Sequence, residues 1–260
     1  MMSRRIFFFD IDGTLCLQNK VSSRVKDAIM NIQKNGDLCF IASGRPPTFI
    51  QDAVKDIPFD GYILVNGAYA TYHDQMIYEV KMNENELKEL CLYLREHHCD
   101  YILQTRSNNY LDKQFTRLYD FFNMIGIKVN SFIRDFDEDE VIKDVIKVEI
   151  WPDNEQVSQD VVERFKNFTW HQYINSNMEV CISGISKAWG IKKVIDYFDI
   201  DIDNTYCFGD GCNDIDMFKT VEHSYAMGNA DEDVKAYAKY VCPSIEEDGV
   251  AVILEQLLEE

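Results

Sequence analysis

The chain has 260 residues, of which 46% are hydrophobic and 27% are charged, so it can bury a sizeable core and fold as one domain or two. Its formal net charge of −19 argues against binding to nucleic acid or to an anionic membrane, because both favour basic surfaces. The net charge does not exclude a small anionic substrate, since one cation and a few basic side chains can reverse the electrostatic field inside a cleft.

The cysteines and the apolar segments indicate the compartment. Eight cysteines are dispersed without a CxxC pair, and several lie in apolar runs, as Cys39 does in LCFIAS. This usage favours reduced, structural thiols in a cytoplasmic protein. The first residues resemble a signal peptide, but Asp10 interrupts the apolar segment, and no run reaches the roughly 20 apolar residues of a membrane helix.

Strands and helices alternate in the first part of the chain. We predict apolar strands at 6–9, 38–42 and 61–65. Between them we predict a helix from Ser22 or Ser23 to about Lys34 and a second helix at 48–55. Because the strands are apolar throughout, this order predicts a doubly wound parallel sheet covered on both faces.

The pattern changes after about Thr71. Strands predicted at 76–80 and 145–151 alternate apolar and polar residues, which is typical of a sheet with one face open to solvent. Helices are predicted at 84–96 and 154–166. The acidic stretch 135–140 is predicted to be a solvated turn.

The apolar pattern of the first strands returns near residue 186. The predicted elements are a helix at 186–198, a strand at 205–208, a short helix at 214–220, and short strands at 224–227 and 240–241. Two further segments, at 231–238 and 250–258, complete the chain. We therefore predict an α/β core formed by 1–80 and 185–260, with a separate α+β domain at 81–184 inserted into it.

Polar residues follow four of the apolar strands at the point where each strand ends. They are Asp10 and Asp12, then Ser43-Gly44-Arg45, then Asn66-Gly67, and finally Gly209-Asp210-Gly211-Cys212-Asn213-Asp214. Ligands of open parallel sheets bind beyond the carboxyl ends of the strands. We therefore expect these side chains to share one rim of the sheet.

The charges on this rim predict a bound cation. Asp10, Asp210 and Asp214 would repel one another unless a positive group lay among them. Hard carboxylate oxygens without a neighbouring His or Cys select Mg²⁺. A cation of this kind holds phosphate, to which Ser43 and Lys187 can add donors and Gly13 and Gly44 close backbone approach. An aspartate is also a ready nucleophile for phosphoryl transfer.

These motifs resemble those of a known superfamily. DIDGT, the Ser-Gly-Arg after the second strand, Lys187 and GDGCND look like the four motifs of the haloacid dehalogenase superfamily, whose core is Rossmann-like. The segments NGA, GISKAWGI, AMGNA and EDGVA are similar to those of its Cof-type (class IIB, C2-capped) sugar-phosphate phosphatases. Their large α/β cap is inserted between the second and third motifs. Over the cap, the resemblance extends only to size, position and rough strand order.

The resemblance implies a role for each matching residue. Asp10 would attack phosphorus, and Asp12 would protonate the leaving oxygen and then activate water. Asp10, the Asp12 backbone carbonyl and Asp210 would hold Mg²⁺. Asp214 would act through metal-bound waters and by positioning Lys187. Residues that would bind the phosphoryl group or hydrogen-bond near it are Ser43, Gly44, Lys187 and Asn213.

The implied function is hydrolysis of small phosphate monoesters, such as sugar phosphates, by a Mg²⁺-dependent phosphatase through an aspartyl phosphate. The expected partner is a small phosphorylated metabolite, with no nucleic acid or membrane, and the protein is expected to be a monomer or a weak homodimer. A phosphomutase of the same superfamily remains an alternative, although the cap is not conspicuously basic. A catalytically silent binding module is another. Asp12 disfavours a dehalogenase or an ion-pumping ATPase, which lack this acid–base aspartate.

Other polar residues have less specific interpretations. Arg45 is predicted to pair with a core acid at the surface, outside the catalytic set. Asn66 either contacts the phosphate or caps a turn. In the cap, the run Arg106, Asn108, Asn109 and Tyr110 is interpreted as an exposed hairpin tip in preference to a substrate contact.

Overall fold

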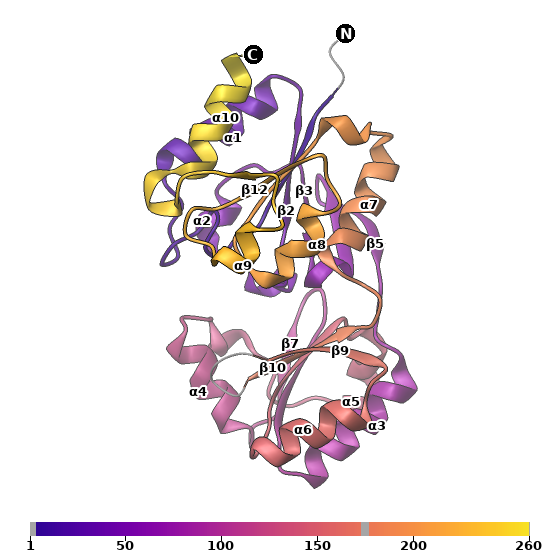
Figure 1. The fold of residues 1–260 in the computed structure, drawn as a ribbon. Helices are drawn as coiled ribbons and strands as arrows, with labels where there is room; N and C mark the ends of the chain where they lie inside the picture. The colour runs from indigo at the N-terminus through magenta and orange to yellow at the C-terminus, as the bar shows by residue number, and fades with distance from the viewer. Residues whose placement is uncertain (1–3, 173–176, 260) are drawn as a thin grey trace. The chain divides into compact units, whose positions relative to one another are not determined.

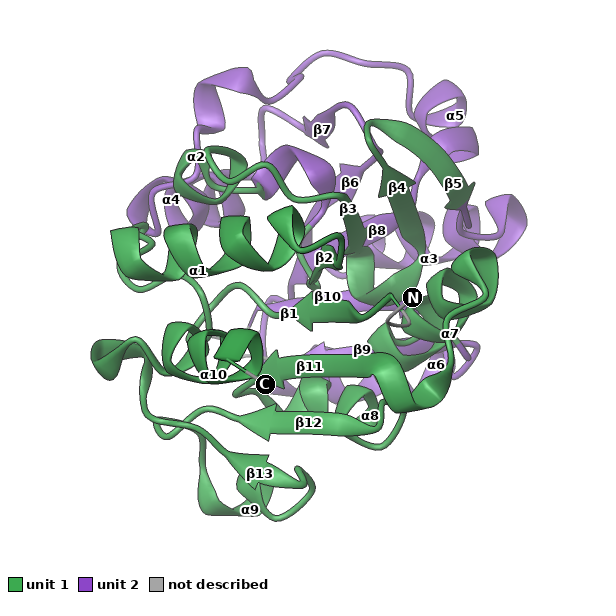
Figure 2. Cartoon of the chain, turned by 90° about the horizontal axis from the view of Figure 1, so that it is seen from above, with its two compact units in different colours: residues 1–45, 50–78, 185–260 green, residues 46–49, 79–184 purple. Residues whose placement is uncertain are grey.

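The computed structural model describes residues 4–172 and 177–259, and the chain divides into two compact units (Figures 1 and 2). The core unit comprises Met1–Arg45, Ile50–Tyr78 and Ile185–Glu260, and the cap unit comprises Pro46–Phe49 and Glu79–Gly184. This division differs from the predicted one at residues 79–80 and at 46–49, which both belong to the cap unit.

The core unit is built on one eight-stranded sheet of order β13-β12-β11-β1-β2-β3-β4-β5. Its parallel strands are β1 (Ile6–Phe9), β2 (Leu38–Ala42), β3 (Gly61–Leu64), β11 (Thr205–Gly209), β12 (His223–Ala226) and β13 (Tyr240–Val241). The predicted doubly wound α/β fold is therefore confirmed. The sheet continues past β3 into antiparallel β4 (Tyr69–Tyr72), which was not predicted, and β5 (Gln75–Glu79), the exposed edge strand.

The register of the central strands positions the polar rim. Phe7, Phe8 and Phe9 of β1 have no exposed surface, which explains why this segment forms a central strand. Phe9 lies opposite Phe208 of β11 on one side and Ile41 of β2 on the other. The three strands end at the same edge, so the residues that follow them are neighbours.

The helices of the core unit flank this sheet. They are α1 (Ser23–Lys34), α2 (Asp52–Lys55), α7 (Lys187–Phe198), α8 (Ile215–Phe218), α9 (Glu232–Lys235) and α10 (Gly249–Glu259). Ser22 caps α1 by accepting a hydrogen bond from the Val25 backbone N–H. Helices α7 and α8 pack their apolar residues against Phe8 and Phe40.

The helix predicted at 48–55 is shorter in the structure. A 3₁₀ turn spans Pro47–Phe49, and α2 begins only at Asp52. Gln51 has an extended backbone (φ −67°, ψ 146°), which interrupts the helix. Phe49 instead packs its ring 5.3 Å from that of Phe122 in the cap unit. This contact explains why Pro46–Phe49 groups with the cap unit.

The cap unit contains a five-stranded antiparallel sheet of order β7-β6-β8-β10-β9. Its strands are β6 (Asp100–Gln104), β7 (Asn109–Leu111), β8 (Lys147–Trp151), β9 (Phe168–Gln172) and β10 (Met178–Ile182). Its helices are α3 (Glu84–Glu96), α4 (Thr116–Met124), α5 (Glu138–Val141) and α6 (Glu155–Arg164). Helices α3 and α6 lie beneath this sheet (Figure 1), and apolar residues of α3, α4 and α6 join those of the sheet in a single cluster.

Two expectations about the cap are wrong. The polar residues of the alternating strand 145–151 were expected to face solvent, but Lys147 and Glu149 are 1% and 5% exposed, and Lys147 forms ion pairs with Glu149 and with Glu179. The acidic stretch 135–140 was expected to be a solvated turn; four of its acidic residues are exposed, but α5 begins within it, so it is not a turn throughout. There Glu138 accepts hydrogen bonds from Arg95 and from Tyr101, so it ties α5 to α3 and β6.

The remaining global features concern thiols and membranes. All eight cysteines are free, and Cys212 is the one with an exposed side chain. This agrees with the expectation of reduced, structural thiols. Among the described residues, no helix is both long and apolar enough to span a bilayer.

Candidate active site

Asp10 lies directly beyond β1, where the backbone fixes its position. Its N–H donates to the Phe208 carbonyl at 3.0 Å, which extends the pairing of β1 with β11 by one residue. Its side chain is 10% exposed and accepts a hydrogen bond from Lys187 Nζ at 2.5 Å. Lys187 begins α7 after the N-cap Ser186, and its side chain is fully buried. The two predicted residues therefore meet as a buried ion pair.

Asp214 is the second carboxylate that contacts Lys187. Its Oδ1 lies 2.6 Å from Lys187 Nζ, and its Oδ2 accepts from the backbone N–H groups of Asp210 and Gly211 at 3.0 and 2.9 Å. A Cβ at Gly209 would lie 2.6 Å from the Asp214 carboxyl carbon. Only glycine fits at that position, so the GDG sequence is required to place this carboxylate.

Asp210 faces the loop that follows β1. Its Oδ1 accepts from the Thr14 hydroxyl at 2.8 Å. Gly13 has φ +83°, and a Cβ there would approach Asp210 Oδ2 to 2.1 Å. The DGT sequence thus supplies both a hydrogen bond to Asp210 and the space that its carboxylate occupies.

The three aspartates form a cluster that can hold a cation. Asp10, Asp210 and Asp214 each offer a carboxylate oxygen, and these atoms lie within 4.8 Å of one another. Lys187 offsets one of their three negative charges, so the cluster retains two. An all-oxygen donor set with this charge suits a hard divalent cation.

The titration of the cluster reflects its burial. Burial raises the pKa of Asp10, and the attraction of Lys187 opposes this rise without cancelling it. Burial also raises the pKa of Asp210 to about 6, against the effect of its hydrogen bond from Thr14. Burial lowers the pKa of Lys187, but Asp10 and Asp214 more than offset this, and its pKa is raised overall. The lysine therefore stays charged.

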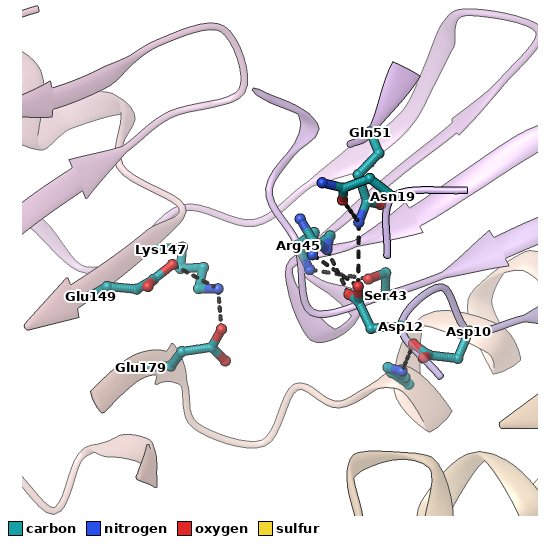
Figure 3. A network of polar contacts seen from close by, with 10 residues as sticks. Asp10, Asp12, Asn19, Ser43, Arg45, Gln51, Lys147, Glu149 and Glu179 are labelled. Carbon is teal, nitrogen blue, oxygen red and sulfur yellow. Dashed lines mark hydrogen bonds and ion pairs between the residues drawn. The ribbon is translucent and has the colours of Figure 1, made fainter. Parts of the chain in front are cut away.

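Asp12 lies on the rim with a partner that the sequence did not assign to it. Its side chain is 53% exposed and forms a bidentate ion pair with Arg45, with Nε–Oδ2 at 2.6 Å and Nη2–Oδ1 at 2.9 Å (Figure 3). Gln51 Nε2 lies 3.4 Å from Asp12 Oδ1 and 3.2 Å from Asn19 Oδ1. The prediction that Arg45 pairs with a core acid at the surface is therefore confirmed, and the acid is Asp12.

Ser43 and Asn66 join the loops after β2 and β3. Ser43 is 2% exposed, and its hydroxyl accepts from the Arg45 N–H at 3.3 Å. The Asn66 N–H donates to the Ser43 carbonyl at 3.1 Å, and Asn66 has φ +48°. A Cβ on Gly44 would lie 2.9 Å from Asn66 Oδ1, so these residues pack closely. Asn213 is exposed, and its binding role stays a prediction.

The cap residues of the predicted hairpin tip differ in how exposed they are in the structure. Arg106 lies in the turn between β6 and β7 with its side chain 55% exposed, as expected of a tip. Asn109 lies in β7 and is only 4% exposed, with its Oδ1 accepting from Thr48 at 3.0 Å, so the tip interpretation is wrong for it. Arg106 and Tyr110 line a cavity of about 350 Å³ within the cap unit.

Comparisons with known proteins show which family the chain belongs to. The model of the haloacid dehalogenase-like hydrolase family matches residues 7–254. The chain is 29% identical over 262 residues to the "Putative phosphatase YkrA" of Bacillus subtilis, covering 98% of each. It is 26% identical over 268 residues to the 5-amino-6-(5-phospho-D-ribitylamino)uracil phosphatase YitU of Bacillus subtilis, covering 95% of each.

A solved structure extends the likeness to three dimensions. A subclass IIB sugar phosphatase of the haloacid dehalogenase superfamily, BT4131, superposes with a TM-score of 0.83 at 28% identity, covering 97% of this chain and 98% of that one. The family model spans both units, and Asp10, Lys187, Asp210 and Asp214 form one cluster. The chain therefore belongs to the haloacid dehalogenase-like hydrolases, within their Cof-type group, and is a hydrolase of the phosphatase type.

Proposed function

We propose that this protein is a Mg²⁺-dependent phosphatase that hydrolyses small phosphate monoesters through an aspartyl phosphate on Asp10. The observation that carries the proposal is the buried cluster of Asp10, Asp210 and Asp214 around Lys187. Such a cluster is costly to bury for structural purposes alone, because its three carboxylates face a single cation. A ligand that brings positive charge compensates this cost.

The residues present fit a bound Mg²⁺. Its ligands would be the carboxylates of Asp10 and Asp210 and the backbone carbonyl of Asp12, with Asp214 acting through water. Magnesium prefers such oxygen ligands and keeps several waters when it binds phosphate. When bound, it would supply positive charge that stabilises the phosphoryl oxygens during transfer.

The side chains of the core unit perform the proposed chemistry. The Asp10 carboxylate attacks phosphorus. A bond forms between a carboxylate oxygen of Asp10 and phosphorus as the bond between phosphorus and the leaving oxygen breaks. Asp12 gives its proton to that oxygen and then takes one from water as the water attacks phosphorus and releases Asp10. Ser43 donates its hydroxyl to a phosphoryl oxygen. Lys187 stays charged beside Asp10 and balances charge as transfer proceeds.

Two relatives support the proposed substrate class. One is named as a sugar phosphatase and the other as a phosphatase of a phosphoribityl compound, and both substrates carry hydroxyl-rich groups. We therefore propose sugar phosphates or related phosphorylated metabolites as substrates. The free cysteines support a cytoplasmic location. A monomer or a weak homodimer stays the expected assembly.

The test is turnover of a panel of phosphate esters, including 4-nitrophenyl phosphate and several sugar phosphates. We expect phosphate release with Mg²⁺, loss of release in EDTA, and recovery when Mg²⁺ is returned in excess. Full turnover after verified metal removal would refute the metal assignment. Failure of the folded protein to release phosphate from any ester would refute the phosphatase, and would favour the silent binding module.

A further inference from the structure

Two sequence segments of the core unit, AMGNA and EDGVA, have no part in the proposed chemistry. AMGNA contains the turn that follows β12, and EDGVA begins at the end of the 3₁₀ turn Ile245–Glu247. A Cβ at Gly228 would lie 2.7 Å from the Ser244 nitrogen, so the two segments meet at a position that only glycine fits. Their close packing therefore needs an explanation beyond the residues that bind phosphate.

Asn229, in the turn after β12, connects both segments to the loop that carries Asp12. Its Nδ2 donates to the Gly13 carbonyl at 2.9 Å, and its Oδ1 accepts from the Ile245 N–H at 2.9 Å. A carbonyl can only accept and a backbone N–H can only donate, so these two partners fix the orientation of the amide. One exposed side chain thus joins three loops that are distant in the sequence.

The 3₁₀ turn supplies a fixed donor for this amide. Ser244 and Glu247 form a capping box, in which Glu247 Oε2 accepts from the Ser244 N–H at 3.1 Å and from its hydroxyl at 2.9 Å. The chain then turns at Asp248, which has φ +57°, and a Cβ at Gly249 would lie 1.9 Å from the Pro243 carbonyl oxygen. The EDGVA segment therefore holds the Ile245 N–H in place.

Gly13 is the residue of the Asp12 loop with the greatest conformational freedom. It has φ +83°, which glycine adopts without strain but can also leave readily. Its neighbours carry the groups that matter to the proposed cation site. The Asp12 carbonyl is a proposed ligand, and the Thr14 hydroxyl donates to Asp210 Oδ1 at 2.8 Å. A change in the Gly13 torsions would therefore displace both groups.

We propose that Asn229 is a positioning residue of the cation site. By holding the Gly13 carbonyl, it keeps the Asp12 carbonyl and the Asp210 carboxylate in the arrangement that the ion requires, and the Ile245 N–H keeps the amide turned toward Gly13. This inference rests on the proposed Mg²⁺ site and deepens it, because the affinity for the metal then depends on a residue that does not touch the ion.

Titration calorimetry of Mg²⁺ binding tests the role of Asn229 without turnover. Asn229→Ala and Asn229→Asp both remove the donor to Gly13, so we expect each to raise the Kd for Mg²⁺ about tenfold. The aspartate variant is the sharper of the two. Its added negative charge would by itself attract the cation, so weaker binding in this variant comes from the lost donor. The control is Asn31→Asp, which adds the same charge at an exposed position of α1 and should leave Kd unchanged.

A double-mutant cycle tests the second hydrogen bond of Asn229. Ile245→Pro removes the N–H that orients the amide, and the site accepts proline because it is the first position of the turn and follows Ser244, whose backbone is extended. We expect Kd for Mg²⁺ to rise several-fold in Ile245→Pro and no further in the double variant than in Asn229→Ala alone. Additive effects would contradict a route from Ile245 through Asn229.

Thermal unfolding of the metal-free proteins separates positioning from a purely structural role. A lower Tm in both Asn229 variants with an unchanged Kd for Mg²⁺ would overturn the proposal and leave the phosphatase intact. A raised Kd, with kcat for 4-nitrophenyl phosphate restored by saturating Mg²⁺, would support it. If the wild type bound no Mg²⁺, this inference and the proposed metal site would both fail. If Kd rises as expected but the wild type hydrolyses no ester, the positioning role stands and the proposed phosphatase fails.

Discussion

Each unit of this protein buries one lysine between two carboxylates, and the two groups differ in what surrounds them. Lys187 of the core unit contacts Asp10 and Asp214. A carboxylate oxygen of Asp210 lies within 4.8 Å of theirs. Lys147 of the cap unit contacts Glu149 and Glu179, and its neighbours are amides. The first group retains two negative charges, whereas the second retains one and has unpartnered amide oxygens close to it.

Because of this difference, similar residues in the two groups favour different ligands. An excess of two charges on hard oxygens, in a tight cluster, is matched by a divalent cation and then by phosphate. A single excess charge beside amide acceptors is matched by neutral hydrogen-bond donors. The proposed transfer chemistry therefore belongs to the core unit, whose carboxylate cluster can hold the cation.

The largest expected effect is that of Asp10→Asn. An amide is neither a carboxylate nucleophile nor a good Mg²⁺ ligand, so kcat should fall at least about 100-fold for every ester. The fold should persist, because one of several repelling acids is removed. Kinetics and thermal unfolding measure both, with the exposed Asp27→Asn on α1 as control. Activity above about 1% of wild type would argue against covalent catalysis at Asp10.

Replacing each lysine separately compares the two units directly. Lys187→Met and Lys147→Met both leave two buried carboxylates without their cation, so each should lower the free energy of unfolding by about 3–5 kcal/mol. Below the unfolding transition, Lys187→Met should reduce kcat for all esters by about 10²–10³. Lys147→Met should chiefly change the ranking of esters. If both variants lost activity equally toward all esters, the proposed difference between the two units would be contradicted.

A smaller effect is expected in the stability of the metal-free protein. The pKa of Asp210 is raised by burial from 3.8 to about 6, so the folded state favours its protonated form. Its contribution to stability is therefore complete below about pH 4 and is lost as the pH rises through about 6. In EDTA, Tm should fall by a few degrees more over this range in the wild type than in Asp210→Asn.

The change in Tm on adding Mg²⁺ tests the same residue. At pH 7 it should raise Tm of the wild type, because a cation favours the ionised carboxylates, and should raise that of Asp210→Asn less. Identical pH profiles and identical Mg²⁺ responses in the two proteins would exclude Asp210 from the cation site.

Much of the core unit could be predicted because its signals are local. Apolar runs such as Phe7–Phe9 are central strands, and a residue placed at a strand end reaches the rim wherever parallel strands share an edge. Lys187 was placed at the start of the helix predicted at 186–198, which the structure confirms, whereas its role came from the resemblance. These placements follow from the backbone and need little knowledge of side-chain packing.

The features that were missed depend on long-range packing. Arg45 was predicted to pair with a core acid, but only the side-chain conformations decide that this acid is Asp12. Phe49 belongs to the cap unit because it finds the Phe122 ring there. Alternation in β8 correctly indicated two different faces, but it could not show that Lys147 and Glu149 would be buried together with Glu179.

The central claim, a phosphoryl group carried by Asp10, is tested most directly in the Asp12→Asn variant. With 4-nitrophenyl phosphate, the leaving group needs little protonation, whereas attack of water on the intermediate needs the base that this variant lacks. Rapid-quench kinetics should show a burst of about one nitrophenolate per enzyme, and peptide mass spectrometry should find the phosphoryl group on Asp10. Steady turnover without a burst, or a phosphoryl group on another residue, would contradict the account.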